Sequence, residues 1–170
     1  MPTRTDSALA KNIVVAHAVK ATIDGLHGVF ATLAKQHGEV SSLMKRVEDD
    51  AEKRVELWPA IRAQLLSHER SELRAVFPEL RMNAETLDLA DQHEDDAIAL
   101  EGFIQELDGT AIESNMWGAK FAALAATVRQ HAADEEREIF PRAQAVLGKT
   151  RTNALDAELL AAEKQIAQTA

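Results

Sequence analysis

The chain has 170 residues, of which 46% are apolar, and its 28 acidic and 19 basic side chains give a formal net charge of −9. This composition fits one folded domain with a substantial core, and it disfavours a disordered chain or a nucleic-acid-binding protein with basic clusters. Because cysteine and tyrosine are both absent, disulfides, iron–sulfur clusters, thiolate zinc sites, thiol catalysis and a tyrosyl radical are excluded.

Helix-forming residues dominate the chain, whereas glycine and proline number only 7 and 4. This balance favours helix almost throughout. We expect an all-α, up-down-up-down four-helix bundle in a single domain, 1–170. Its core bundle would span about 30–147, with an N-terminal helical extension at 7–29 and a C-terminal helix at 153–168. The polar N-terminus and the lack of a long apolar run indicate a cytoplasmic protein with no membrane partner.

The first helical pattern runs from residue 8 to about residue 47, and Gly25 and Gly28 could divide it. His37 lies on its apolar stripe. His27 falls on the same stripe and could replace His37 as a metal ligand. The distance of His37 from the following turn favours His37.

The second helix is predicted to begin near residue 58, with Pro59 in its first turn. It carries His68 and Glu72 and should end near Phe77 and Pro78. The third helix, which Asn83 could cap, runs to about residue 107 and carries His93 on its apolar stripe.

The fourth helix is predicted from about residue 114 to residue 140, and it carries His131 and Glu135. A short helical piece should then end at Gly148. Asn153 could cap a last amphipathic helix. Dimerisation through that last helix would fit an alternative, purely structural role.

Two segments of the chain share one template. From His68 and again from His131, the sequence gives a glutamate four residues later, then Phe-Pro at the ninth and tenth positions. Residues four apart lie on one face of a helix, and each proline is expected to stop its helix. A single His–Glu pair of this kind is usually a surface pair. The repeated pattern, in apolar stripes, instead favours metal binding in the core, because an unpaired buried carboxylate is costly.

Antiparallel helices would bring the imidazoles of His37, His68, His93 and His131 to one level of the bundle. Imidazole and carboxylate together suit iron, manganese or zinc, and Glu72 and Glu135 are placed to bridge two metal ions. Glu69 lies beside the ligand face and is an additional candidate. Among the other residues, we expect Glu136 and Glu138 to be exposed, Phe77 and Phe140 to shield the site, Trp58 and Trp117 to plug the far end, and His17 to be a surface or satisfied core residue.

This order of motifs resembles a hemerythrin-like domain of the HHE cation-binding family, over roughly residues 30–146. The resemblance implies a four-helix bundle with two iron ions in a non-haem centre, bridged by oxo and carboxylate groups. It implies binding or sensing of O₂, or related handling of NO, peroxide or iron. The metal ligands that it implies are His37, His68, Glu72, His93, His131 and Glu135, with Glu72 and Glu135 as bridges.

The chain departs from the family pattern at one position. Respiratory hemerythrins carry five histidines, two of them four residues apart on the third helix, whereas Leu89 and Ala97 lie four residues either side of His93. Some family members use a carboxylate beside the second-helix histidine, and Glu69 fits that place. The substitution favours sensing, iron handling or peroxide chemistry over simple O₂ storage.

We therefore expect a binding or sensing protein first, with O₂, NO or peroxide as its small ligand and no organic substrate. The second expectation is a di-iron enzyme with peroxidase, catalase-like or ferroxidase activity, or a protein of iron homeostasis. The third is a structural or interaction bundle without metal.

Overall fold

The computed structural model describes residues 25–169. Of the expected N-terminal extension, only residues 25–29 fall within this range, and His17 lies outside it.

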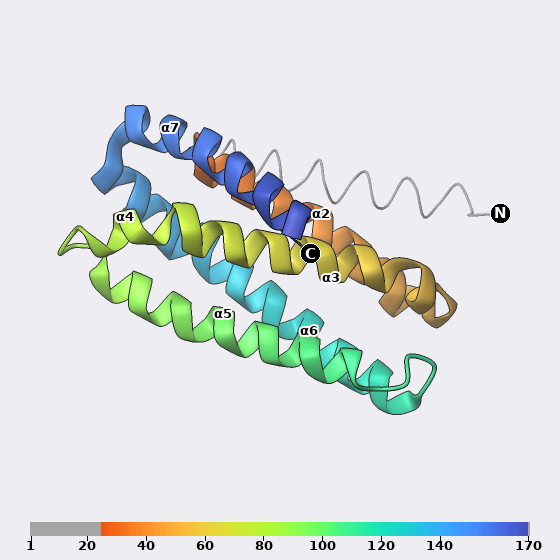
Figure 1. The fold of residues 1–170 in the computed structure, drawn as a ribbon. Coiled ribbons are helices and arrows are strands. Elements are labelled where there is room, and N and C mark those ends of the chain that lie inside the picture. Colours follow the sequence, from red (N-terminus) through yellow and green to blue (C-terminus); the bar gives the residue numbers. More distant parts are fainter. Residues whose placement is uncertain (1–24, 170) are drawn as a thin grey trace.

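Four long helices build the bundle: α2 (Val29–Asp49), α3 (Arg54–Ala75), α5 (Leu87–Asp108) and α6 (Asn115–Asp134). They run alternately in opposite directions along one axis (Figure 1). α2 packs against α3 and α6, and α5 packs against the same two helices. The four helices thus enclose one interior, and the predicted all-α, up-down-up-down bundle is confirmed.

Short elements connect the long helices at both ends of the bundle, and the C-terminal part of the chain adds a fifth long segment (Figure 1). A 3₁₀ turn (Ala51–Lys53) joins α2 to α3, and α4 (Phe77–Arg81) follows α3. A π-helix (Glu135–Ile139) continues α6 into α7 (Phe140–Thr169), which Gly148 interrupts with φ 76° and ψ 163°. Beyond Gly148, α7 turns back and lies along α2 and α3 (Figure 1).

Two apolar clusters fill the interior, one toward each end. The cluster near the α2–α3 and α5–α6 connections includes Met44, Ile61, Ile104 and Phe121, and it contains Trp58 and Trp117 packed edge to face, as expected. The cluster at the opposite end includes Phe30, Leu33, Phe77, Leu80, Phe140, Leu155 and Leu159. The predicted histidines and glutamates lie between these clusters along each helix, so the apolar ends fix their level.

Both Phe-Pro pairs begin a helical segment, so the expectation that the prolines only stop helices was incomplete. α3 ends at Ala75, and Pro78 is the second residue of α4. Pro141 is likewise the second residue of α7, after the π-helix. The first turn of a helix tolerates proline because its N–H groups have no partner within the helix.

Three other boundaries differ from the sequence-based expectation. α3 begins at Arg54 because the carboxylate of Asp50 caps the 3₁₀ turn that leads into it, accepting from the N–H of Glu52 at 3.1 Å. Asn83 does not cap α5; its amide donates to the carbonyl of Glu79, and α5 begins at Leu87. Asn153 lies inside α7.

The fourth helix begins as expected. The hydroxyl of Ser114 accepts a hydrogen bond from the N–H of Trp117 at 3.1 Å, and α6 starts at the next residue. This bond satisfies one of the free N–H groups in the first turn.

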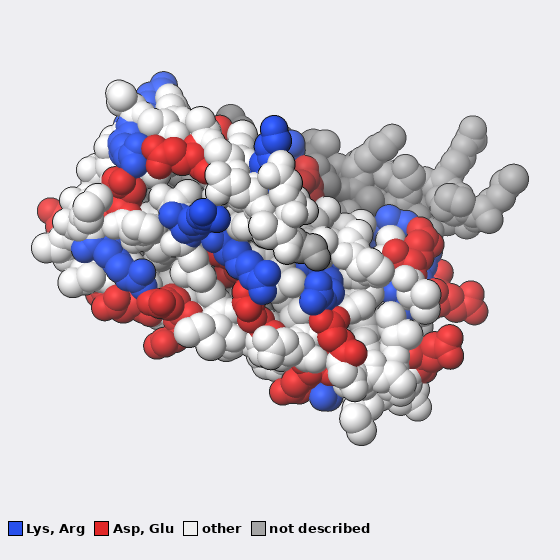
Figure 2. Space-filling model, in the orientation of Figure 1, with Lys and Arg blue, Asp and Glu red and all other residues white. Residues whose placement is uncertain are grey.

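Charged side chains of both signs are interspersed on the face shown in Figure 2. Among the described residues, several charged side chains form ion pairs between elements, such as Arg70 with Glu101 at 2.7 Å and Arg151 with Glu79 at 2.6 Å. Within residues 25–169, no helix combines the length and the apolar character needed to cross a membrane.

Gly28 allows the chain to enter α2 beside the second part of α7. Its φ is 56°, and a Cβ there would lie 2.5 Å from the backbone carbon and oxygen of Thr152. We predict that Gly28→Ala lowers the free energy of unfolding by about 1–3 kcal/mol, through backbone strain and this clash. Chemical denaturation of the metal-free protein measures it.

Gly102→Ala is the matched control, because Gly102 lies within α5 and a Cβ there meets no atom within 4 Å. We expect that substitution to raise the free energy of unfolding by up to about 1 kcal/mol. Equal effects of the two substitutions would contradict the role of Gly28.

Candidate metal centre

Each helix of the bundle delivers ionisable side chains to one level of the core. α2 supplies His37, α5 supplies His93 and α6 supplies His131. α3 and the π-helix supply the carboxylates and one more imidazole: His68, Glu69, Glu72, Glu135 and Glu136. The side chains of all eight are at most 10% exposed.

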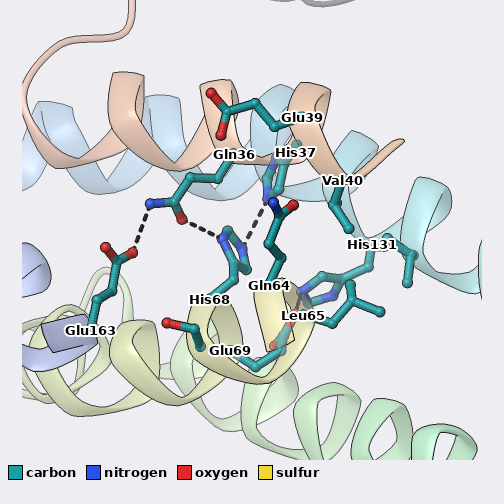
Figure 3. A pocket seen from close by; sticks show the side chains of 12 residues that line it. Gln36, His37, Glu39, Val40, Gln64, Leu65, His68, Glu69, His131 and Glu163 are labelled. Atoms are coloured by element: carbon teal, nitrogen blue, oxygen red, sulfur yellow. Dashed lines mark hydrogen bonds and ion pairs between the residues drawn. The ribbon is translucent and has the colours of Figure 1, made fainter. Parts of the chain in front are cut away.

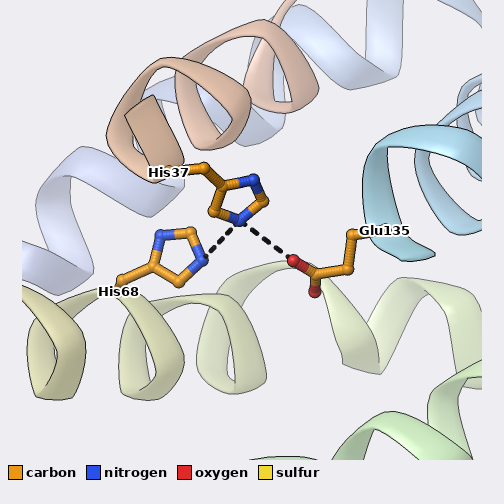
Figure 4. A group of neighbouring side chains, drawn as sticks. All are labelled: His37, His68 and Glu135. Carbon is orange, nitrogen blue, oxygen red and sulfur yellow. Dashed lines mark hydrogen bonds and ion pairs between the residues drawn. The ribbon is translucent and has the colours of Figure 1, made fainter. Parts of the chain in front are cut away.

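The first group joins two imidazoles and a carboxylate (Figure 4). The Nε2 of His37 lies 3.0 Å from the Oε2 of Glu135 and 3.2 Å from the Nε2 of His68. Ligand atoms about 2.1 Å from a shared cation lie roughly 3.0–3.4 Å from each other in octahedral or tetrahedral geometry. These separations therefore fit three atoms that share one metal ion.

The second group joins Glu69, His93 and His131. The Nε2 of His131 lies 3.4 Å from the Oε1 of Glu69, and the Nε2 of His93 lies 3.8 Å from its Oε2. One glutamate thus turns its two oxygens toward two imidazoles. The structure places Glu69 among the ligand candidates rather than beside them.

Two carboxylates lie between the groups. Glu135 directs Oε2 to His37, and its Oε1 lies 3.1 Å from the Nδ1 of His93 and 3.3 Å from the Nε2 of His131. The Oε2 of Glu72 lies 3.5 Å from the Nε2 of His68 and 3.7 Å from the Nε2 of His93. Glu72, His93 and Glu135 form a third candidate group. This is the arrangement that bridging carboxylates require.

Buried polar atoms without a hydrogen-bond partner concentrate here. Among the described residues, nine buried side-chain nitrogen and oxygen atoms lack one, and eight of them belong to Glu69, Glu72, His93, His131 and Glu135. Such atoms normally find partners, because leaving one unmade costs about 1–3 kcal/mol. Imidazole nitrogens and carboxylate oxygens are metal ligands, so the donor set fits cations at this level.

In the absence of metal, protons supply the compensating charge. Burial alone would lower the pKa of His37, but its close contacts with Glu135 and Glu136 and their negative charge outweigh burial and raise the pKa to about 9. Burial acts likewise on His131, where Glu135 and Glu69 raise the pKa to about 12. Both imidazoles are therefore cationic at neutral pH.

The remaining groups adjust to these two cations. Burial and the charge of His37 lower the pKa of His68 to about 4. Burial and the charges of Glu135 and Glu69 raise the pKa of Glu72. Burial opposes ionisation of Glu135, yet the charge of His131 and the close contacts with imidazoles hold its pKa well below the usual range. The cluster therefore divides into ionised and neutral members.

Two imidazoles are oriented by acceptors outside the groups. The Nδ1 of His37 donates to the Oε1 of Glu136 at 3.1 Å, and the Nδ1 of His68 donates to the Oε1 of Gln36 at 2.9 Å. Each contact leaves Nε2 facing the cluster. Metal-binding histidines are commonly fixed in this way.

The two phenylalanines of the repeated motif stack on imidazoles. Phe77 lies against His93, with ring centroids 3.8 Å apart and planes 6° apart. Phe140 stacks on His37 at 5.8 Å and 11°. Both rings are fully buried, which agrees with the expected shielding role.

Glu136 is buried, so the expectation that it is exposed was wrong; Glu138 is exposed as expected. The cause is the π-helix, in which the N–H of Phe140 bonds to the carbonyl of Glu135, five residues back. This winding turns consecutive residues through a smaller angle than an α-helix does. Glu135 and Glu136 therefore both face inward. In the sequence, the only sign of this inward turn is the pair of adjacent glutamates upstream of Phe140 and Pro141.

The alternative first-helix histidine lies elsewhere. His27 precedes α2, where its N–H donates to the Oε1 of Gln144 and its Nδ1 lies 2.9 Å from the hydroxyl of Thr152. Gly28 separates it from the helical stripe. Of the two candidates, only His37 reaches the cluster.

A cavity of about 170 Å³ opens on one side of the cluster, between α2 and α3 and beside α7 (Figure 3). Imidazoles of the cluster reach its wall, and so does Glu69. Its remaining polar lining includes Gln36, Gln64, Ser67 and Glu163. The volume suits a few small molecules, since one water occupies about 30 Å³ of liquid.

Residues 19–143 match the model of the hemerythrin HHE cation binding domain. Comparison with curated proteins and with solved structures gives no match. The matched range contains the four bundle helices and every histidine and glutamate of the cluster. It ends before Gly148, so the second part of α7 lies beyond it.

The division into ionised and neutral carboxyls predicts opposite results for two similar substitutions in the metal-free protein. Glu135→Gln removes the anion that faces two cationic imidazoles, and we expect it to destabilise the fold by about 3–5 kcal/mol. Glu72→Gln replaces a carboxyl whose raised pKa favours its neutral form, so we expect a change below about 1 kcal/mol. Denaturation at mildly acidic pH measures both. A larger loss for Glu72→Gln would refute this charge assignment.

Proposed function

The chain belongs to the hemerythrin HHE cation-binding family, and from this membership we propose that it is a non-haem di-iron protein that binds or senses O₂ or NO. The observation that carries the proposal is the overlap of three His/Glu groups at the level where eight buried polar atoms lack a hydrogen-bond partner. This donor set exceeds the needs of a single zinc ion, which takes about four donors.

We assign one iron to His37, His68 and Glu135, and the other to Glu69, His93 and His131. Glu72 and Glu135 would bridge them, since each places an oxygen near imidazoles of both groups. Iron fits a mixed imidazole and carboxylate set better than a softer metal would. Bound there, a pair of irons supplies redox-active positions for a small diatomic ligand or peroxide.

The chain's own residues would control access and orientation. Phe77 and Phe140 stack on His93 and His37 and exclude water from that end of the cluster. Glu136 and Gln36 hold the imidazoles of His37 and His68 with Nε2 toward the metals. The cavity of about 170 Å³ is smaller than the roughly 300–1,000 Å³ typical of organic-ligand pockets. A small ligand such as O₂, NO or peroxide therefore suits it better than an organic substrate.

The second candidate is a di-iron enzyme with peroxidase, catalase-like or ferroxidase activity. It is favoured by the polar lining of the cavity, where Gln64, Ser67 and Glu69 accompany the imidazoles. Such a wall suits peroxide or hydrated Fe(II) better than it suits O₂. A spectral change that O₂ produces and its removal reverses would support binding or sensing. Steady turnover of peroxide or Fe(II) would support the enzyme.

The ligand assignment predicts which substitutions remove metal. We expect about two irons per chain in the wild-type protein after anaerobic reconstitution. His131→Ala and Glu135→Ala should each lose most of that iron. The first removes an assigned ligand of one iron, and the second removes an assigned bridge between the two irons. Elemental analysis of the purified variants measures the content.

His27→Gln serves as the control, since His27 contacts Thr152 and Gln144 away from the cluster. It should retain the wild-type iron content. Equal iron in all three variants would show that metal binds elsewhere.

The raised pKa values predict that metal binding releases protons. His37, with a pKa of about 9, and His131, with a pKa of about 12, both carry an extra proton at neutral pH, and a metal ion must displace these protons to reach the nitrogens. The apparent affinity for Fe(II) should therefore rise as pH increases from 6.5 toward 9. Anaerobic calorimetric titration in two buffers of different ionisation enthalpy counts the protons. A binding enthalpy that is the same in both buffers would contradict this expectation.

A further inference from the structure

A line of hydrogen bonds connects the second part of α7 to His68 (Figure 3). The Nε2 of Gln36, on α2, donates to the Oε1 of Glu163, on α7, at 2.7 Å. The Oε1 of the same glutamine accepts from the Nδ1 of His68, on α3, at 2.9 Å. Three helices thus meet through three polar side chains at the edge of the cavity.

Each hydrogen bond in this line determines which atom donates in the next one. An ionised carboxylate can only accept hydrogen bonds, so Glu163 requires the NH₂ group of Gln36 to face it. The amide oxygen then faces His68 and can only accept, so the Nδ1 of His68 must carry the hydrogen. A neutral imidazole holds one ring hydrogen, which leaves Nε2 without a hydrogen and able to accept or to bind a metal ion.

The free nitrogen faces the cluster. The Nε2 of His68 lies 3.2 Å from the Nε2 of His37 and 3.5 Å from the Oε2 of Glu72. The opposite tautomer would place a hydrogen at this point and block ligation. The contact with Gln36, which Glu163 holds in this orientation, therefore favours the tautomer of His68 that presents a lone pair to the metal position.

We propose that Gln36 and Glu163 are positioning residues that hold His68 in the tautomer with Nε2 free for the metal. The proposal deepens the assigned di-iron function and rests on it. His37 receives equivalent support from Glu136 within the bundle. For His68 the support originates beyond Gly148, in the part of α7 that follows the family-matched residues 19–143.

The helix beyond Gly148 would consequently do more than cover the bundle. Leu155 and Leu159 anchor it in the apolar cluster, and Glu163 lies one turn further along the same helix. Loss of such an outer partner of a metal-binding histidine typically weakens metal binding about 10–100-fold. A structural role for Glu163 would instead lower stability without changing the tautomer of His68.

The test measures the tautomer directly, in the metal-free full-length protein. Long-range ¹H–¹⁵N NMR distinguishes the protonated from the unprotonated ring nitrogen, and the His68→Gln variant identifies the His68 signals. We expect the Nδ1–H form in the wild type and a mixture with the Nε2–H form in Glu163→Ala. Anaerobic Fe(II) titration of the same two proteins should show about 10-fold or greater weakening in the variant.

Glu158→Ala is the matched control on the same helix, because Glu158 pairs with Arg151 at 2.7 Å on the surface. It should leave both the tautomer and the Fe(II) affinity unchanged. Thermal melting of both variants separates any general loosening of α7 from an effect on the ring.

An exchange of the two side chains provides a rescue. Gln36→Glu alone places two carboxylates against each other and should weaken Fe(II) binding. Gln36→Glu combined with Glu163→Gln should restore both hydrogen bonds. The carboxylate at position 36 can accept from the amide at position 163 and from the Nδ1–H of His68. We expect the double variant to recover the Nδ1–H tautomer and most of the affinity.

The Nε2–H tautomer in the wild type, or an unchanged tautomer in Glu163→Ala, would overturn the proposal. A wild-type protein with the Nδ1–H form that takes up no Fe(II) would overturn the metal function instead. The two failures are therefore distinguishable.

Discussion

Neutralising charge in the middle of an apolar core is the constraint on which the rest of this structure depends. Carboxylates and imidazoles from four helices lie between two apolar clusters, where an isolated charge would cost several kcal/mol. Without metal, the pKa of His37 and His131 rises and that of Glu135 falls, so protons take the place of cations. Metal ions could replace these protons on the same groups. In either state, positive charge would neutralise the carboxylates at this level of the bundle. Packing of the apolar clusters fixes the helices, and the helices in turn fix how closely the donors approach each other.

The π-helix at Glu135–Ile139 is the local feature that completes this centre. A regular α-helix would direct Glu135 inward and leave Glu136 outside. The wider winding brings both carboxylates into the core, one between the candidate metal-binding groups and the other on the Nδ1 of His37. It also ends beside Pro141, whose missing N–H can join no helical ladder. The second Phe-Pro pair therefore contributes in two ways. Pro141 lies where the π-helix gives way to α7, and Phe140 stacks on the imidazole of His37.

Much of the centre could be predicted from the sequence, because the periodicity of the apolar residues and the four-residue spacing of His68 with Glu72 and of His131 with Glu135 both survive folding. The helix count, their alternating directions and the level of the histidines follow from local pattern and helix geometry. Three features did not follow. The burial of Glu136 depends on π-winding, which a 3.6-residue period cannot anticipate. The exclusion of His27 depends on the positive φ of Gly28. The line from Glu163 to His68 joins residues 95 positions apart through Gln36, and no spacing in the sequence announces it.

The phenylalanine of each repeated motif stacks on a histidine from the other half of the chain. Phe77, from the first half, stacks on His93 of the second, and Phe140, from the second half, stacks on His37 of the first. Outside these rings the symmetry ends. His37 and His68 each have a defined acceptor on Nδ1, whereas both ring nitrogens of His93 face carboxylates of the cluster. The imidazoles of the first group are therefore fixed by acceptors outside the group, Glu136 and Gln36. The imidazole of His93 is fixed mainly by carboxylates of the cluster itself. In the proposed di-iron centre the two metal positions would therefore be unequal, because only the one built on His37 and His68 has imidazoles fixed by acceptors outside the cluster.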